Sequence, residues 1–305
     1  MLNDIQKRIL EIVADMKDTG SGAVNIRSDG EKAFRRNTEH IVIESKTDKD
    51  GIDIRIAPGT KKEAVHIPVL LTKTGLQDMV YNDFYIGEDA EVDIIAGCGI
   101  HNCGEGHSQH DGVHTFYVGK NASVKYVEKH YGEGDGKRTL NPQTVVYLQE
   151  GATITLETTQ IRGVDDTKRY TKVICEGENS EVIIRENLLT EGEQFAHSEM
   201  DVFLNAAGSR AQIISRSVAK DRSVQVFYPR AEGNSACFGH VQCDAIIMGG
   251  AKVRAIPEIT CNHVDASLIH EAAIGRIAGE QILKLMTLGM DAEAAEQKIL
   301  EGFLR

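Results

Sequence analysis

The chain has no tryptophan among its 305 residues, and aromatic residues make up only 5% of it. Positive charge is also in short supply, because 34 Lys and Arg residues face 46 Asp and Glu residues, for a formal charge of −12. This balance argues against general binding to nucleic acid or to an anionic membrane, since the dominant phosphate term would be repulsive. No stretch approaches the roughly 18 apolar residues that a membrane-spanning helix needs.

Cysteine is scarce as well, with six residues in the chain. That number is too small for a disulfide-based scaffold, and the first ten residues, MLNDIQKRIL, are too polar for a secretory signal. We therefore expect a cytoplasmic protein with reduced thiols, in which metal binding and thiol reactivity are the roles of interest. The P-loop, Rossmann and G-x-S-x-G motifs are missing from the sequence, so we do not expect it to hydrolyse nucleotides in the P-loop manner.

Two kinds of hydrophobic periodicity occupy the N-terminal third of the chain. Apolar residues recur at spacings of three and four between Leu2 and Met16, which predicts an amphipathic helix packed on the main body. From about Ile41 the period changes to two, as in the alternation of Ile52, Ile54 and Ile56, which predicts half-buried strands.

Between residues 85 and 260 one pattern recurs: large residues, a short turn rich in Gly, Asn or Glu, a small residue, and an alternating strand. Copies begin at residues 85, 117, 147, 174, 203 and 246. Such self-similarity is typical of a solenoid, because each unit can bury its apolar face only against its neighbour. We predict a mainly β fold, a parallel β-helix. A two-sheet sandwich is the alternative, although its strands would be spaced about 8–12 residues apart.

Helical periodicity returns near the C-terminus. One helix is expected from Glu280 to Leu288, closed by Gly289, and a second, with Asp291 as its N-cap, runs to Phe303. We expect this helical hairpin to cap one end of the solenoid. The expected organisation is an N-terminal helix and first strands over residues 1–80, a β-helix core over 81–265 and a C-terminal helical domain over 266–305.

The densest group of potential metal ligands lies between residues 98 and 114. Thiolates and imidazoles suit zinc and iron, and a glycine-rich loop can bring several of them together. The C-x4-C spacing is not that of a zinc finger, and the alternative is that the histidines make ordinary hydrogen bonds along solenoid strands. The candidate metal ligands, for zinc among others, are Cys98, His101, Cys103 and His107.

A second group of thiols, imidazoles and carboxylates lies near the C-terminus. Residues one solenoid turn apart stack at roughly 4.8 Å, so groups distant in sequence can face each other. Together they could receive sulfur or bind iron, whereas a single buried cysteine is usually a small hydrophobe. The residue types alone identify no reaction. The group consists of Cys237, His240, Cys243, Asp244, Cys261, His263, His270 and Glu271.

The same region resembles the SufB/SufD family of iron–sulfur cluster assembly proteins. The resemblance rests on the segment from His270-Glu271 through Gly275 and Glu280-Gln281 to Gly289, and on the strand Gln242-Cys243-Asp244. It extends from about residue 85 to 305 and is strongest from about residue 185 onward. It implies a right-handed parallel β-helix followed by a small helical domain.

The resemblance also implies a function and its residues. The chain would be a scaffold subunit, not an enzyme, on which sulfur and iron form a transient iron–sulfur cluster. Cys243 matches the position proposed in SufB to carry nascent sulfur or cluster, Glu271 matches a proposed carboxylate ligand of SufB, and His270 matches a functional histidine of SufD.

Partners follow from the resemblance too. A SufC-type ABC ATPase would dock on the C-terminal helices, for which the candidate contacts are Gln281, Leu285 and Met286. The chain is shorter than the long SufB form, so we expect a homodimer or a pair with a SufD-like paralogue. A sulfur donor and apo iron–sulfur proteins complete the set, with no nucleic acid and no membrane.

Two other interpretations stay open at this point. The first is a zinc-binding β-helix enzyme or a carbohydrate-binding protein, although the lack of tryptophan for sugar stacking counts against it. The second is a structural adaptor that binds the ATPase without any metal.

Overall fold

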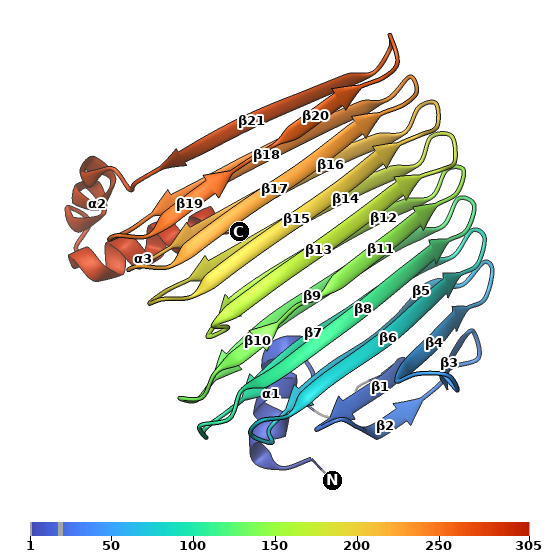
Figure 1. Ribbon diagram of the computed structural model, residues 1–305, viewed down its shortest axis with the longest axis horizontal. Helices are drawn as coiled ribbons and strands as arrows, with labels where there is room; N and C mark the ends of the chain where they lie inside the picture. The colour runs from blue at the N-terminus through green and yellow to red at the C-terminus, as the bar shows by residue number, and fades with distance from the viewer. Residues whose placement is uncertain (1, 18–20, 305) are drawn as a thin grey trace.

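The computed structural model describes residues 2–17 and 21–304. The chain winds into a parallel β-solenoid of about eight turns, and most turns add one strand to each of two facing sheets (Figure 1). The predicted parallel β-helix is therefore confirmed. One sequence repeat of about 30 residues is one turn of the solenoid and contains more than one strand. The repeat is therefore longer than the strand spacing of a sandwich.

Sheet A contains ten strands among the described residues and ends at β2 and β21. Its strands pair in parallel except at the N-terminal end, where β1 and β2 form an antiparallel pair. In spatial order they are β2 (Glu31–Arg36), β1 (Ala23–Ser28), β5 (Lys61–Leu71), β7 (Glu91–His101), β9 (Ser123–Glu133), β12 (Thr153–Arg162), β14 (Glu181–Thr190), β16 (Arg210–Ala219), β18 (Phe238–Ile247) and β21 (Ser267–Gly275).

Sheet B contains eleven strands in the described part of the chain. Its N-terminal end is likewise closed by an antiparallel pair, β3 and β4. Its strands are β3 (Ile41–Ser45), β4 (Gly51–Ile56), β6 (Gln77–Ile86), β8 (Ser108–Val118), β10 (Arg138–Leu140), β11 (Gln143–Leu148), β13 (Asp166–Cys175), β15 (Phe195–Leu204), β17 (Val224–Gly233), β19 (Lys252–Ala255) and β20 (Glu258–Cys261).

The repeated turns form one edge of the solenoid, where the chain passes from sheet B to sheet A. Each needs a residue with left-handed backbone, which favours Asn, Asp and Gly, and Asp89, Asn121 and Gly151 supply it. Hydrogen bonds link successive turns, as from Asn121 N to the Glu150 carbonyl at 2.9 Å. The copy beginning at residue 246 lies instead between β18 and β19, at the opposite edge, which explains its irregular offset.

The interior is built from in-register rows of side chains. Ile54, Phe84, Phe116 and Val146 occupy equivalent positions on β4, β6, β8 and β11, and all are fully buried. The rings of Phe84 and Phe116 stack with their centroids 4.3 Å apart. Each turn thus covers the apolar face of the one before it.

Helix α1 (Asp4–Ala14) packs on the outer face of sheet A, against β5, β7 and β9, as its amphipathic pattern predicts (Figure 1). Asn3 and Gln6 form a capping box at its start. Two glycines of β7 admit the helix, because a Cβ at Gly97 would lie 2.3 Å from the Val13 carbonyl oxygen and one at Gly99 would lie 2.0 Å from Ile9 Cγ2.

Helices α2 (Gly279–Met286) and α3 (Ala292–Phe303) form the predicted C-terminal pair. Gly289 takes a positive φ of 93°, and the Asp291 side chain accepts a hydrogen bond from Ala294 N at 2.7 Å. The expectation that this pair caps the solenoid is wrong. The helices lie beside the strand ends in Figure 1, whereas β20 and most of β21 are exposed. Only residues 276–278 separate β21 from α2, so the chain between them is too short to carry the helices across the last turn. No helix within the described ranges is long and apolar enough to cross a membrane.

Candidate functional site

Cys243 and His270 meet on the last two strands of sheet A. The parallel register of β18 and β21 aligns Val241 with His270 and Cys243 with Ala272. Alternation along the strands puts Cys243 and His270 on the same, inward face. The Cys243 Sγ lies 3.6 Å from His270 Nε2, so this pair of predicted site residues is brought together.

Glu271 lies on the other face of the same strand. It directly follows His270, and successive side chains of a strand point to opposite sides. Its side chain is 65% exposed, and its Oε2 lies 3.6 Å from His240 Nε2. The three residues predicted to act together are therefore divided, with a thiol and an imidazole inside and a carboxylate outside.

The Cys243 thiol is expected to keep its proton at neutral pH. Burial, followed by the nearby charges of Asp244 and Glu186, raises the pKa of Cys243 to about 12. Iron and sulfane sulfur both react with the thiolate, so either would have to displace this proton. His270 is the side chain within reach of the thiol that has a nitrogen able to accept the proton.

A row of buried polar side chains continues inward from Cys243 along sheet A. Ser215 is in register with Cys243 and donates a hydrogen bond to Glu186 at 3.2 Å. Ser198 donates to the same carboxylate at 2.7 Å, and the Arg169 Nε lies 3.6 Å from it. Ionised groups at this depth need such partners, because an unpaired buried charge is costly.

This polar row was not predicted from the sequence, although a signal for it is present there. Glu128, Thr158, Glu186, Ser215 and Cys243 are successive register partners in sheet A, one per turn. Their numbers differ by 30, 28, 29 and 28, which is the repeat length itself. Aligning the repeats on their turns would have revealed the row.

Cys98 lies in the interior near Glu128, at the N-terminal end of the polar row. It lines a cavity of about 20 Å³ together with His110, His114, Glu128 and His130, which is room for about one water molecule. Burial raises the pKa of Cys98 well above its usual value and lowers the pKa of His114 to about 4. Burial also lowers the pKa of His130. The cavity wall therefore holds the protonated thiol of Cys98 and the neutral imidazole of His114 beside a carboxylate.

Glu128 is that carboxylate. Burial alone would raise its pKa, but His130 and Arg169 outweigh burial and lower the pKa of Glu128. Arg169 lies between the two interior carboxylates, with Nη1 3.7 Å from Glu128 and Nε 3.6 Å from Glu186. The Arg169 guanidinium thus lies close both to the carboxylate beside Cys98 and to the carboxylate near Cys243.

The four candidate metal ligands of residues 98–107 do not come together. Cys98 points inward from β7, whereas His101, an odd number of residues further, is on the outer face. His107 Nε2 lies 2.7 Å from Thr139 Oγ1, and only His101 and Cys103 meet, at 3.2 Å. Among residues 2–17 and 21–304 no group of three or more His, Cys, Asp or Glu side chains is placed to hold a metal ion, so zinc has no support here.

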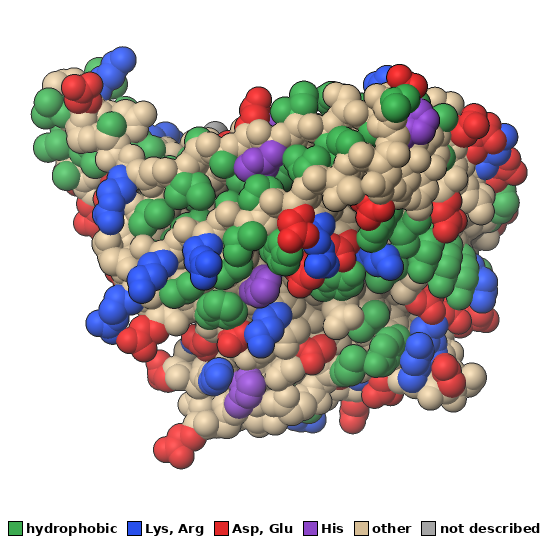
Figure 2. All heavy atoms as spheres, turned by 45° about the horizontal axis from the view of Figure 1, so that its top comes forward, with side chains coloured by type: hydrophobic (Ala, Val, Ile, Leu, Met, Phe, Trp, Pro, Cys, Tyr) green, Lys and Arg blue, Asp and Glu red, His purple; other side chains and the backbone are tan. Residues whose placement is uncertain are grey.

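The last turn of the solenoid exposes apolar side chains. β21 ends the strand order of sheet A, so one of its edges has no neighbouring strand in the described structure. In Figure 2, where this end comes forward, hydrophobic side chains lie across the visible surface. The large apolar residues exposed on this turn and its connections are Ile256, Ile259, Val264, Ile269 and Ile274.

Helix α2 carries the three residues predicted to bind a partner. Gln281 and Met286 are exposed, and Leu285 is partly buried. Leu283, on the same helix, is 61% exposed, and none of the residues of α2 is buried. An amphipathic helix whose apolar side chains remain in contact with water is an unusual feature of an isolated chain.

Comparison with known proteins shows the family of the chain. The family model of the SUF system FeS cluster assembly SufBD core domain matches residues 75–303. The chain therefore belongs to the SufBD family of iron–sulfur cluster assembly proteins, which confirms the resemblance seen in the sequence.

Its relatives include archaeal proteins of this family. An iron–sulfur cluster assembly SufBD family protein of Methanocaldococcus jannaschii is 26% identical over an alignment that covers 98% of each chain. One of Archaeoglobus fulgidus is 29% identical, with 84% of this chain and 69% of the relative aligned. One of Methanothermobacter thermautotrophicus is 27% identical, and the alignment covers 86% of this chain and 64% of that protein.

Proposed function

We propose that this chain is a scaffold subunit on which sulfur and iron are assembled into a cluster, with Cys243 as the residue that carries the sulfur or the nascent cluster. The observation that carries this proposal is the pair of Cys243 and His270, 3.6 Å apart across the last two strands of sheet A in a SufBD-family solenoid. The scaffold has no catalytic turnover of its own in this proposal.

The chemistry of the pair suits temporary binding. Loading requires the Cys243 thiol to lose its proton, and His270 is placed to accept that proton or to become a ligand itself. Glu271 lies on the opposite face of β21, so its proposed role as an oxygen ligand requires this strand to rearrange when the end of the solenoid is paired. A thiolate and an imidazole hold iron less firmly than four thiolates would, which favours transfer of the cluster to a recipient.

We also propose the partners that this role requires. A second copy of the chain, or a SufD-like paralogue, would pair with the open edge of β21, because an uncovered strand edge is a template for another strand. A SufC-type ATPase would dock on α2 through Gln281, Leu285 and Met286, which is supported by the exposed apolar side chains of that helix. A sulfur donor and apo iron–sulfur proteins would meet the scaffold in the cytoplasm.

Anaerobic reconstitution tests the proposal. The protein is incubated with ferrous iron and a sulfide source, desalted, and analysed for iron and acid-labile sulfide per chain. Cys243→Ser should lose most of both, because a serine hydroxyl does not replace a thiolate ligand. Cys175→Ser is the matched control, since Cys175 is also a buried free thiol, on β13 in the other sheet.

Two outcomes would decide the matter. Loss of iron and sulfide in Cys243→Ser, with normal loading of Cys175→Ser and unchanged circular dichroism in both, would support Cys243 as the carrier. Full loading of Cys243→Ser would contradict it.

A further inference from the structure

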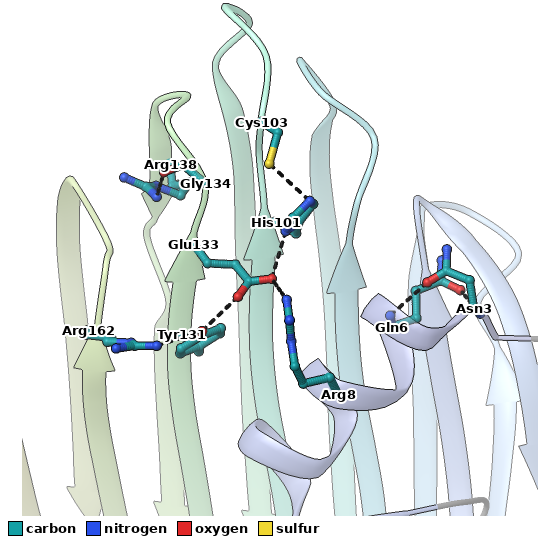
Figure 3. Close-up of polar contacts among 10 residues, drawn as sticks. All are labelled: Asn3, Gln6, Arg8, His101, Cys103, Tyr131, Glu133, Gly134, Arg138 and Arg162. Carbon is teal, nitrogen blue, oxygen red and sulfur yellow. Dashed lines mark hydrogen bonds and ion pairs between the residues drawn. The ribbon is translucent and has the colours of Figure 1, made fainter.

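A second thiol site lies on the outer face of sheet A, away from the Cys243 pair. His101 ends β7 and Glu133 ends β9, and the parallel register of these strands aligns the two residues. His101 Nδ1 lies 2.7 Å from Glu133 Oε1, and its other nitrogen, Nε2, lies 3.2 Å from the Sγ of Cys103 (Figure 3). A thiol, an imidazole and a carboxylate are thus joined in one line.

The carboxylate of this line is firmly held. Tyr131 donates a hydrogen bond to Glu133 Oε2 at 2.9 Å, and Arg8 of α1 forms an ion pair with Oε1 (Figure 3). Burial would raise the pKa of Glu133, but the hydrogen bonds from Tyr131, His101 and Arg8 outweigh it and lower the pKa. An ionised Glu133 keeps the proton of His101 on Nδ1 and leaves Nε2 free to accept one from Cys103.

This arrangement is suited to a nucleophile and unsuited to a shared metal ion. Cys103 and Glu133 contact opposite nitrogens of one ring, so a single ion bound to His101 would reach only one of them. A nucleophile hydrogen-bonded to a base that is oriented by a third group is the usual signature of an activated thiol. Cys103 is exposed, unlike Cys243 and Cys98, so a macromolecular reactant can approach it.

We propose that Cys103, His101 and Glu133 form a reactive-thiol site that attacks sulfur–sulfur bonds, either the persulfide or the disulfide of a second molecule. His101 takes the thiol proton, and Cys103 Sγ bonds to a sulfur of the partner. The original sulfur–sulfur bond breaks, and His101 returns the proton to the leaving thiolate. A persulfide R–S–SH leaves Cys103–S–SH and R–SH, and a disulfide R–S–S–R leaves Cys103–S–S–R and R–SH.

The substrate class follows from what the site supplies. Exchange at sulfur requires a thiolate, an open approach and a proton for the leaving group. Cys103, its exposed loop and His101 provide these three. Arg8 and Tyr131 act as positioning residues, because they contact Glu133 and not the thiol. The inference does not depend on cluster assembly at Cys243.

The test measures the rate of modification of Cys103 by mass spectrometry. Cys261→Ser is the parent protein, because Cys103 and Cys261 are the exposed thiols among the described cysteines. The parent is mixed in separate arms with glutathione persulfide and with glutathione disulfide at pH 7. His101→Gln is expected to slow the reaction by tenfold or more, since general-base assistance is typically worth about 10²–10⁴. Glu133→Gln is expected to slow it less.

His107→Gln is the control variant, because His107 belongs to the same loop but bonds to Thr139, and its rate should match that of the parent. Reaction with the persulfide alone would identify a sulfane-sulfur acceptor, and reaction with both reagents a general exchange site. The proposal is overturned if neither reagent modifies Cys103, or if folded His101→Gln reacts as fast as the parent. Cys243→Ser should leave the Cys103 rate unchanged, so failure of this inference and failure of the assembly role would be distinguishable.

Discussion

At the scale of single residues, the solenoid interior depends on histidines that stay neutral. His114 is enclosed between two strands, with Nδ1 2.7 Å from the Tyr126 hydroxyl and Nε2 3.3 Å from the Asn82 side-chain nitrogen. Both contacts are satisfied by a ring with one proton, in which Nδ1 donates and Nε2 accepts. A second proton would place a charge on a buried ring, only 7% of which is exposed.

The stability of the protein should depend on pH, because His114 is buried in its neutral form. His114 has a pKa of about 4 in the folded protein and about 6.5 in the unfolded chain, so the unfolded state binds more protons as the pH falls through this window. The stabilisation that depends on neutral His114 is complete above pH 6.5 and is lost as the pH falls toward 4. Between pH 7.5 and pH 5 the loss should be about 2 kcal/mol. Chemical denaturation at the two pH values measures it.

His114→Gln provides the comparison, since a glutamine does not titrate. Its free energy of unfolding should fall less than that of the wild type over the same pH interval, by about the same 2 kcal/mol. An equal fall in both proteins would mean that His114 is not the residue responsible.

At the scale of elements, α1 depends on two glycines of β7. The added methyl of Gly99→Ala would meet Ile9, which is fully buried against the sheet. The helix must shift outward, and the expected loss of stability is about 1–3 kcal/mol. Thermal unfolding measures it. Gly275→Ala, on β21 with nothing within 4 Å of the added atom, should change stability little, and an equal loss in both variants would argue against the helix contact.

The turns between sheets make a second prediction at this scale. Asn121 has a φ of 55°, a left-handed conformation that β-branched residues avoid. Asn121→Val should destabilise the protein by roughly 1–2 kcal/mol, whereas Asn121→Gly should cost much less. Denaturant midpoints compare the two variants. If valine proved as well tolerated as glycine, this conformation would not be what selects the residue at the turn.

The elements were predictable where a local pattern determines them. The strand periodicity, the repeated turns and the caps Gly289 and Asp291 all depend on neighbours in sequence, and the structure confirms them. The grouping of Cys98 with His101 was not confirmed, because strand alternation places them on opposite faces. The polar row escaped prediction because its members are one turn apart, and of the Cys103 site only Glu133, one turn from His101, was missed.

At the scale of the whole molecule, the two ends of the solenoid differ. The N-terminal end is closed by two antiparallel pairs, whereas the C-terminal end presents an open edge and exposed apolar side chains. The predicted cap would have covered this end, and its actual position beside the strands leaves the end available.

A charge in the exposed patch, as in Ile274→Lys, should weaken self-association by tenfold or more, measured by analytical ultracentrifugation. An unchanged association constant would place the contact elsewhere.

Cluster assembly is proposed to take place at the open C-terminal end of the solenoid, on Cys243. The most direct measurement separates monomer from dimer after anaerobic reconstitution and determines iron and acid-labile sulfide in each fraction. Iron and sulfide should both elute with the dimer of the wild type and be lost from Cys243→Ser. Iron and sulfide that remained on Cys243→Ser, in either fraction, would contradict it.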